Sequence, residues 1–106
     1  MKDSDLKLLY DVMVSLCQYT FRETKCRRRC FVDQKGMFAL IARRKGATLR
    51  QITVFMGWRE HSSAIHAIRT MQGFVDIYPA FKKQYHKILE EYEFREAAGV
   101  LEQAHS

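Results

Sequence analysis

Apolar residues recur along this chain at steps of three and four, the period of a helix with one buried face. The first such stripe predicts a helix from about residue 4 to 22, with Asp3 or Ser4 as its cap. A second helix is expected to start at Asp33 and to stop before Gly46, because glycine commonly terminates helices. Its predicted inward residues are Met37, Phe38, Leu40 and Ile41.

The middle of the chain predicts two short helices that meet at a corner. Thr48 can cap the first of them, and Gly57 would end it. The next helix is expected to start near Glu60 or His61. Together they give the outline of a helix-turn-helix over residues 48–72. Their predicted buried residues are Leu49, Ile52, Phe55, Met56, Ala64, Ile65, Ala67, Ile68 and Met71.

The last stripe predicts a closing helix from about residue 77 to 97, set apart from the corner by Gly73. Pro79 would lie near its first turn, where a missing N–H costs little. The stripe consists of Ile77, Phe81, Tyr85, Ile88 and Tyr92. We therefore expect an all-α fold, a compact bundle of about five helices that contains a helix-turn-helix. A single domain would span residues 1–98, and residues 99–106 would form a C-terminal tail.

The composition agrees with one globular domain, since the chain has 106 residues and 47% of them are apolar. No apolar run approaches the roughly 20 residues that cross a bilayer, and the N-terminus lacks the order of a signal peptide. We expect a cytoplasmic protein with no membrane partner. Cys17, Cys26 and Cys30 would stay thiols, and Cys26 and Cys30 have no further ligand nearby in sequence. No metal, cofactor or small-molecule substrate is expected.

The charge is unevenly distributed. The net charge is +6, but residues 22–59 hold eleven basic against two acidic residues (+9), and the remainder hold seven against ten (−3). Such segregation suits a surface that binds a polyanion, although a solvated basic surface is the alternative. The densest cluster lies in an expected loop and consists of Lys25, Arg27, Arg28 and Arg29. It could contact phosphates or a narrow minor groove, or be an exposed basic segment or the frayed end of the first helix.

A second candidate surface lies where the helix after the corner begins. Its polar residues are Arg59, Glu60, His61, Ser62 and Ser63. In the major groove such side chains can recognise base edges, and backbone N–H groups at the same end can hold a phosphate. The alternative is that Ser62 or Ser63 only caps the helix. His66, one turn further on, could face DNA or pack against the core, and Trp58 would be a hydrophobic anchor.

Five more basic residues are candidates for contacts with the DNA backbone: Arg43, Arg44, Lys45, Arg50 and Arg69. The first three also have a structural explanation, because cations in the last turn of a helix complement its dipole.

These residues resemble the C-terminal DNA-binding domain of the bacterial replication initiator DnaA, a Trp-repressor-like fold. The likeness spans roughly residues 5–95 and is carried by Ile52, Met56, Gly57, Arg59, Glu60, His61, Ser62, Ser63, Ile65, His66, Ala67 and Met71. It implies that Arg59 to Ser63 contact bases or nearby phosphates in the major groove. It also implies that an arginine of the cluster Lys25 to Arg29 enters the minor groove. Thr53, Ala64 and Thr70 depart from the family, and Ala42 stands where a phosphate-binding Lys is common.

The resemblance favours a module that prefers certain sequences of duplex DNA, as a monomer or weak dimer, in replication or its control. The chain has no Gly-rich phosphate loop and no room for an ATPase domain, so we expect a stand-alone relative of that domain, with a fragment as the alternative. An adaptor that binds a protein partner is a competing function, and RNA or single-strand binding is another. We do not expect an enzyme, because Glu60, His61 and Ser62 are neighbours on one helical turn and point in different directions.

Overall fold

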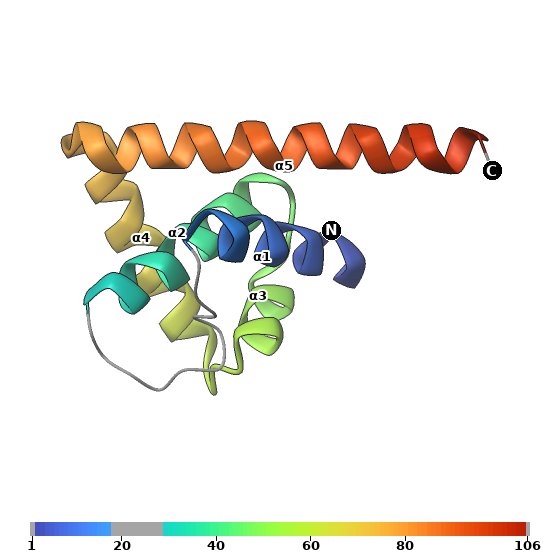
Figure 1. Ribbon diagram of the computed structural model, residues 1–106. Coiled ribbons are helices and arrows are strands. Elements are labelled where there is room, and N and C mark those ends of the chain that lie inside the picture. The colour runs from blue at the N-terminus through green and yellow to red at the C-terminus, as the bar shows by residue number, and fades with distance from the viewer. Residues whose placement is uncertain (1, 18–28, 106) are drawn as a thin grey trace.

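The computed structural model describes the backbone of residues 2–17 and 29–105, and the side chains of residues 2–16 and 32–98. Within these ranges it contains no strand and five helices: α1 (Asp3–Cys17), α2 (Arg29–Arg44), α3 (Leu49–Met56), α4 (His61–Ile77) and α5 (Pro79–His105). The predicted all-α bundle is confirmed. Helix α5 lies across one side of the other four helices, and the corner between α3 and α4 lies on the opposite side (Figure 1). No described helix has the length and apolar character to span a bilayer.

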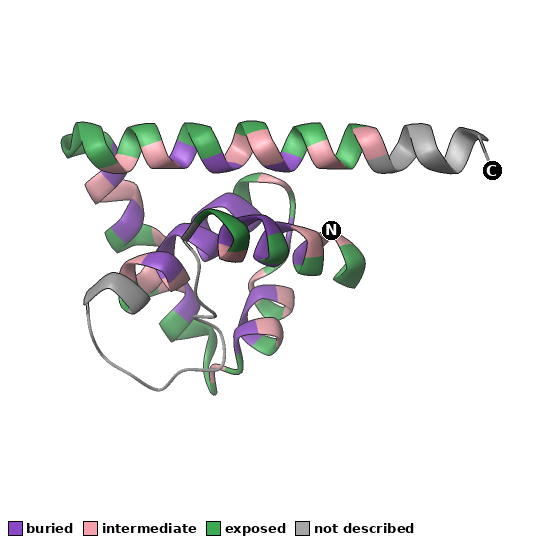
Figure 2. Ribbon diagram, viewed as in Figure 1, coloured by how far each residue is buried: buried purple, intermediate pink, exposed green. Residues whose placement is uncertain are grey.

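Helix α2 is the centre of the bundle. Every residue from 36 to 42 is buried, so this stretch has no exposed face (Figure 2). The predicted inward residues Met37, Phe38, Leu40 and Ile41 are among them. The ring of Phe38 stacks on Phe55 of α3 with centroids 5.2 Å apart, and meets the edge of Tyr10 of α1 at 6.5 Å. A stretch enclosed in this way must be apolar all round, and the charged residues of α2 all lie outside residues 36–42.

Helix α2 packs most extensively against α4, and Gly36 permits the close approach. A Cβ atom at residue 36 would lie 3.3 Å from Cε of Met71 and 3.5 Å from the carbonyl oxygen of Ala67. An alanine at this position would therefore require Met71 to shift by a few tenths of an ångström. Because α4 carries the predicted recognition residues, this contact fixes their position relative to the core.

The predicted start of α2 at Asp33 is wrong, since the helix begins at Arg29. Residues 29–32 contain no Gly or Pro, so nothing in the backbone stops the helix from extending in the N-terminal direction. Repulsion between neighbouring cations costs only a few tenths of a kcal/mol per pair on a helix surface. The expected loop therefore contributes its last residues to α2.

The predicted break at Gly73 is also wrong, because α4 continues through it to Ile77. The chain bends at Tyr78, which is extended (φ −102°, ψ 116°) as residues before a proline tend to be, and α5 starts at Pro79. Ile77 therefore ends α4 with its side chain 71% exposed, outside the buried stripe of α5 where it was expected. Glycine costs about 1 kcal/mol in a helix, and the packing of Phe74 and Val75 beyond it offsets that cost.

Helix α5 covers α1 and the C-terminal end of α2. Tyr85, Ile88 and Tyr92 are buried on its inner face, as predicted. The Arg95 guanidinium donates to the Ser15 hydroxyl of α1 at 3.1 Å and pairs with the Glu91 carboxylate at 3.0 Å. The helix runs to His105, beyond the predicted end near residue 97, so its backbone stays helical through residues that were expected to form a tail.

Replacing Gly73 with Ala should stabilise the fold by about 0.5 to 1 kcal/mol, because Ala favours a helix interior over Gly. A Cβ atom at this position would have no neighbour within 4 Å. Chemical denaturation of wild type and variant measures the change. Gly36→Ala is the matched control: it gains the same propensity but meets Met71, so its stability should rise less. An equal gain in both variants would contradict the tight contact between α2 and α4.

The Tyr92 hydroxyl should titrate late. Burial, the charges of Glu96 and Asp5, and a hydrogen bond to Glu96 raise the pKa of Tyr92 from 10.0 to about 12. Its contribution to stability is therefore complete below pH 10 and is lost as the pH rises from about 10 to 12. The difference in ultraviolet absorbance between wild type and Tyr92→Phe should give a midpoint near pH 12. Over that range wild type should also lose free energy of unfolding relative to the Phe variant.

Candidate nucleic-acid interface

The first helix of the corner starts with a reciprocal cap. The Thr48 hydroxyl accepts from the backbone N–H of Gln51 at 3.1 Å, and the Gln51 side chain accepts from the backbone N–H of Thr48 at 2.9 Å. Two N–H groups that a helix start leaves unpaired are thus satisfied. Thr48 is confirmed as the cap, and the start of α3 is fixed by hydrogen bonds that depend on these two residues.

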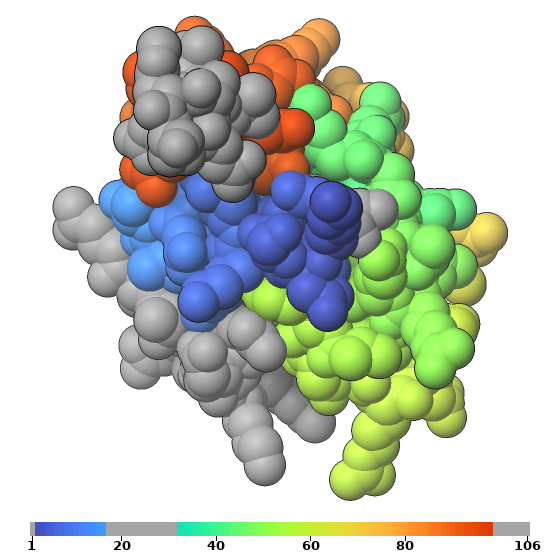
Figure 3. Space-filling view, turned by 90° about the vertical axis from the view of Figure 1, so that its right-hand side faces the viewer, coloured from blue at the N-terminus to red at the C-terminus, as the bar shows by residue number. Residues whose placement is uncertain are grey.

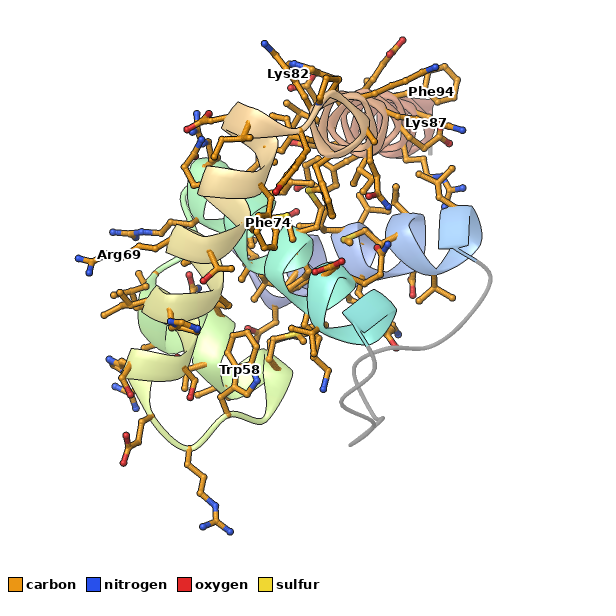
Figure 4. All side chains as sticks on the ribbon, turned by 90° about the vertical axis from the view of Figure 1, so that its left-hand side faces the viewer. Trp58, Arg69, Phe74, Lys82, Lys87 and Phe94 are labelled. Carbon is orange, nitrogen blue, oxygen red and sulfur yellow. The ribbon has the colours of Figure 1, made fainter. Side chains whose placement is uncertain are left out.

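Gly57 ends α3, as predicted, and turns the chain toward α4. Its φ of 73° is in the left-handed region, where glycine has no steric penalty. The N–H of Gly57 bonds the carbonyl of Val54 at 3.2 Å, and the N–H of Trp58 bonds that of Thr53 at 3.0 Å. This pair of bonds is a Schellman motif. Trp58 is half-buried against the core at the corner, which supports its prediction as an anchor (Figure 4).

Thr53 shows how a departure from the resembled family is accommodated. It is buried, and its hydroxyl donates to the Leu49 carbonyl of the preceding turn at 2.6 Å. The hydroxyl is therefore satisfied within α3, and threonine fits at this buried position without leaving a polar group unpaired.

The polar cluster at the start of α4 is exposed, and its members are Arg59, Glu60, His61, Ser62 and Ser63. Glu60 is the residue before the helix, and its side chain makes no capping bond. Its carboxylate instead accepts from the Ser62 hydroxyl at 3.1 Å. Neither serine is the N-cap of α4. The alternative that Ser62 or Ser63 only caps the helix is therefore wrong. The corner segment projects from the molecule on the side away from α5 (Figure 3).

His66 and Arg69 follow the cluster along α4, and both are exposed. His66 therefore does not pack into the core. Its side chain borders a groove of about 340 Å³ between α2 and α4, which the Met71 and Phe74 side chains help to line. Arg69 extends away from the body (Figure 4). It lies with Arg43 at a hollow of about 280 Å³ whose apolar lining is Leu49, Ile65 and Ile68.

The cations at the end of α2 divide into two groups. Arg43 donates to the carbonyl of Ala47 at 2.9 Å and lies beside Arg69. Arg44 instead hydrogen-bonds the side chain of Gln72 and lies 6.0 Å from the centre of the Tyr85 ring. Lys45 pairs with the Glu93 carboxylate of α5 at 2.7 Å. Arg44 and Lys45 therefore connect α2 and the residue after it to α4 and α5. The other three cations predicted to contact the DNA backbone, Arg43, Arg50 and Arg69, are exposed and make no such contact with the described side chains of α5.

The predicted basic cluster is only partly within the described residues. Lys25, Arg27 and Arg28 lie outside them, and Arg29 is the first residue of α2, with its side chain not described. Sequence reasoning missed the apolar lining shared by Arg43 and Arg69. No local signal could have found it, because these two residues are far apart in sequence and meet only through the packing of α2 with α4.

No protein-family model, curated protein or solved structure matches this chain. The resemblance to the DnaA domain consequently stays a prediction carried by the residues at the corner.

Replacing Gly57 with Ala should destabilise the protein by about 1 to 2 kcal/mol, because a side chain in the left-handed region meets the following carbonyl oxygen. No neighbour lies within 4 Å of the added Cβ, so the loss would come from the backbone alone. Thermal or chemical unfolding measures it. Gly57→Asn is the control, since asparagine tolerates this region, and it should lose less stability than the Ala variant. Equal losses would contradict the assignment.

Proposed function

We propose that this chain binds double-stranded DNA and reads it with the first turn of α4. The observation that carries the proposal is the exposed cluster Arg59 to Ser63, which projects on a corner fixed by the Gly57 motif. An arginine there can fork onto guanine, a carboxylate can accept from a cytosine amine, and imidazole or hydroxyl groups can serve either kind of partner. Placing that turn in the major groove presents several recognition groups at once.

The charge distribution supports the same orientation. Residues 22–59 carry a net charge of +9 and include Arg43, Arg50 and Arg59. On α4, Arg69 extends away from the body and could reach the phosphates that border a groove occupied by the helix start. In this proposal Lys25, Arg27, Arg28 and Arg29 contact further phosphates or the adjacent minor groove. Neutralising phosphates releases condensed counterions, which makes binding dependent on salt.

The resemblance to the DnaA domain suggests the process, which is replication initiation or its control in the bacterial nucleoid. One position already separates this chain from that family. Ala42, where a phosphate-binding Lys is common, is completely buried in the last turn of α2. It cannot contact DNA, so this chain would make fewer contacts with the DNA backbone than the resembled family. More of the binding free energy would then come from the clusters Arg59 to Ser63 and Lys25 to Arg29.

Selection of duplexes from a random pool, followed by titration of the enriched site, tests the proposal. Arg59→Ala and His61→Ala should each reduce discrimination against single-base changes by about 1 to 3 kcal/mol, which is the value of a good bidentate contact. Arg69→Ala should weaken binding to all duplexes alike and lower the slope of log affinity against log salt by about 1.

Lys82→Ala is the matched control, because it removes one charge from the outer side of α5, away from the corner (Figure 4). It should change neither discrimination nor the salt slope. A binding constant that does not vary with salt would overturn the proposal. A folded protein that ignores duplex, single-stranded DNA and RNA but retains a protein partner would instead support an adaptor.

A further inference from the structure

Among the residues that the structure describes, none covers the outer face of α5. The helix turns Tyr85, Ile88 and Tyr92 toward the body, while Lys83, Glu90 and Phe94 are exposed on the opposite side. Lys87 is exposed at the edge of this outer face, where it also borders a small hollow shared with Met13 and Leu16 of α1. Phe94 is 70% exposed, although it is one of the largest apolar side chains in the helix. Lys87 and Phe94 project from the same flank of α5, and Lys82 points away from the body on the other (Figure 4). At 27 residues the helix is about 40 Å long, close to the longest dimension of the molecule, 43 Å.

A hollow of about 370 Å³ lies on this outer face, lined by Lys87, Glu90, Glu91 and Phe94. Their spacing along the helix is i, i+3, i+4 and i+7. Four residues at that spacing form the hole that receives one side chain of a facing helix in knobs-into-holes packing. The shape of the surface therefore suits a second helix laid along α5.

The lining of the hollow favours a particular side chain. Besides Lys87 itself, the lining presents the Glu90 carboxylate, which would attract a cation, and the Phe94 ring, which would pack against an apolar stem. Arg95 already pairs with Glu91 at 3.0 Å, and Glu90 is exposed beside it. A lysine side chain combines a cation with an apolar stem, so it fits the hollow.

The same helix also supplies such lysines. Its first half carries Lys82, Lys83 and Lys87, and the segment after it carries Glu90, Glu91, Glu93 and Glu96. Two parallel copies would bring like charges together, whereas two antiparallel copies bring each basic half against the acidic half of the other. With the two-fold axis near Ile88 and Leu89, Lys87 of one copy faces Glu90 of the other, and Lys83 faces Phe94.

We propose that two copies of this chain pair in antiparallel orientation through the outer face of α5, each placing Lys87 in the hollow of the other. The α3–α4 corner is on the opposite side of the body from α5 (Figure 1). The two corners of the pair would therefore point away from each other. If the corner binds duplex DNA, which is the proposed function on which this last step depends, the pair holds two separate duplexes and does not span adjacent half-sites on one.

Sedimentation equilibrium at millimolar protein and low salt tests the pairing without DNA. Wild type should show a dimer whose dissociation constant rises with salt. Lys87→Glu and Glu90→Lys should each weaken association about tenfold, because each turns two attractive contacts into two repulsive ones. An equal mixture of these two variants should associate again, as should the double variant that carries both changes, since opposite charges then face each other.

Lys7→Glu is the control, because it makes the same charge reversal at an exposed position of α1 and should leave association unchanged. Circular dichroism confirms that each variant is folded. A wild type that remains monomeric, or single variants whose mixture and double variant both stay monomeric, would overturn the antiparallel pairing. Affinity for one duplex should be the same in Lys87→Glu as in wild type, whereas capture of a second duplex should need about tenfold more protein, in step with the weaker association. Failure of duplex binding in both proteins would refute the DNA function and leave the dimer intact.

Discussion

Burial of the centre of α2 is the constraint on which the rest of the structure depends. A helix without an exposed face needs partners on all sides, and α1, α3, α4 and α5 all pack against it. Gly36 lets α4 approach, Phe38 engages the aromatic rings of α1 and α3, and the cations at the end of α2 reach α4 and α5. The corner between α3 and α4 is thus positioned by the core around α2, to which Trp58 anchors it. A polar cluster can project from it because its support lies elsewhere.

Much of the fold follows from local signals. Thr48 followed three residues later by Gln51, and Gly57 after an apolar stripe, mark helix ends through hydrogen bonds that involve only near neighbours. The errors arose where no such signal decided the outcome. Nothing between residues 29 and 33 stops a helix, so Asp33 lies inside one. Gly73 only weakly disfavours a helix, and the packing of the residues after it offsets that cost. Pro79 has no backbone N–H and cannot continue the hydrogen bonds of α4, so the helix ends before it.

The candidate interface was predictable only in its continuous part. Arg59 to Ser63 are adjacent in sequence, and their exposure follows from the apolar spacing of the residues after them. The sequence does not show which of the cations outside this cluster are free to contact DNA. Arg44 and Lys45 resemble Arg43 in sequence, but their partners Gln72 and Glu93 lie 28 and 48 residues further along the chain. Tertiary structure, and not the local sequence, decides which of these cations is paired with another residue of the protein.

The connection between α2 and α3 has no spare residue. Gly46, with a φ of 102°, closes α2 through its N–H bond to Arg43, buried Ala47 bonds the Ala42 carbonyl, and Thr48 begins the next cap. An inserted residue would disrupt one of these three roles and rotate α3 relative to the core. In a lineage that diverges freely in sequence, the length of this connection should therefore be far less variable than its composition.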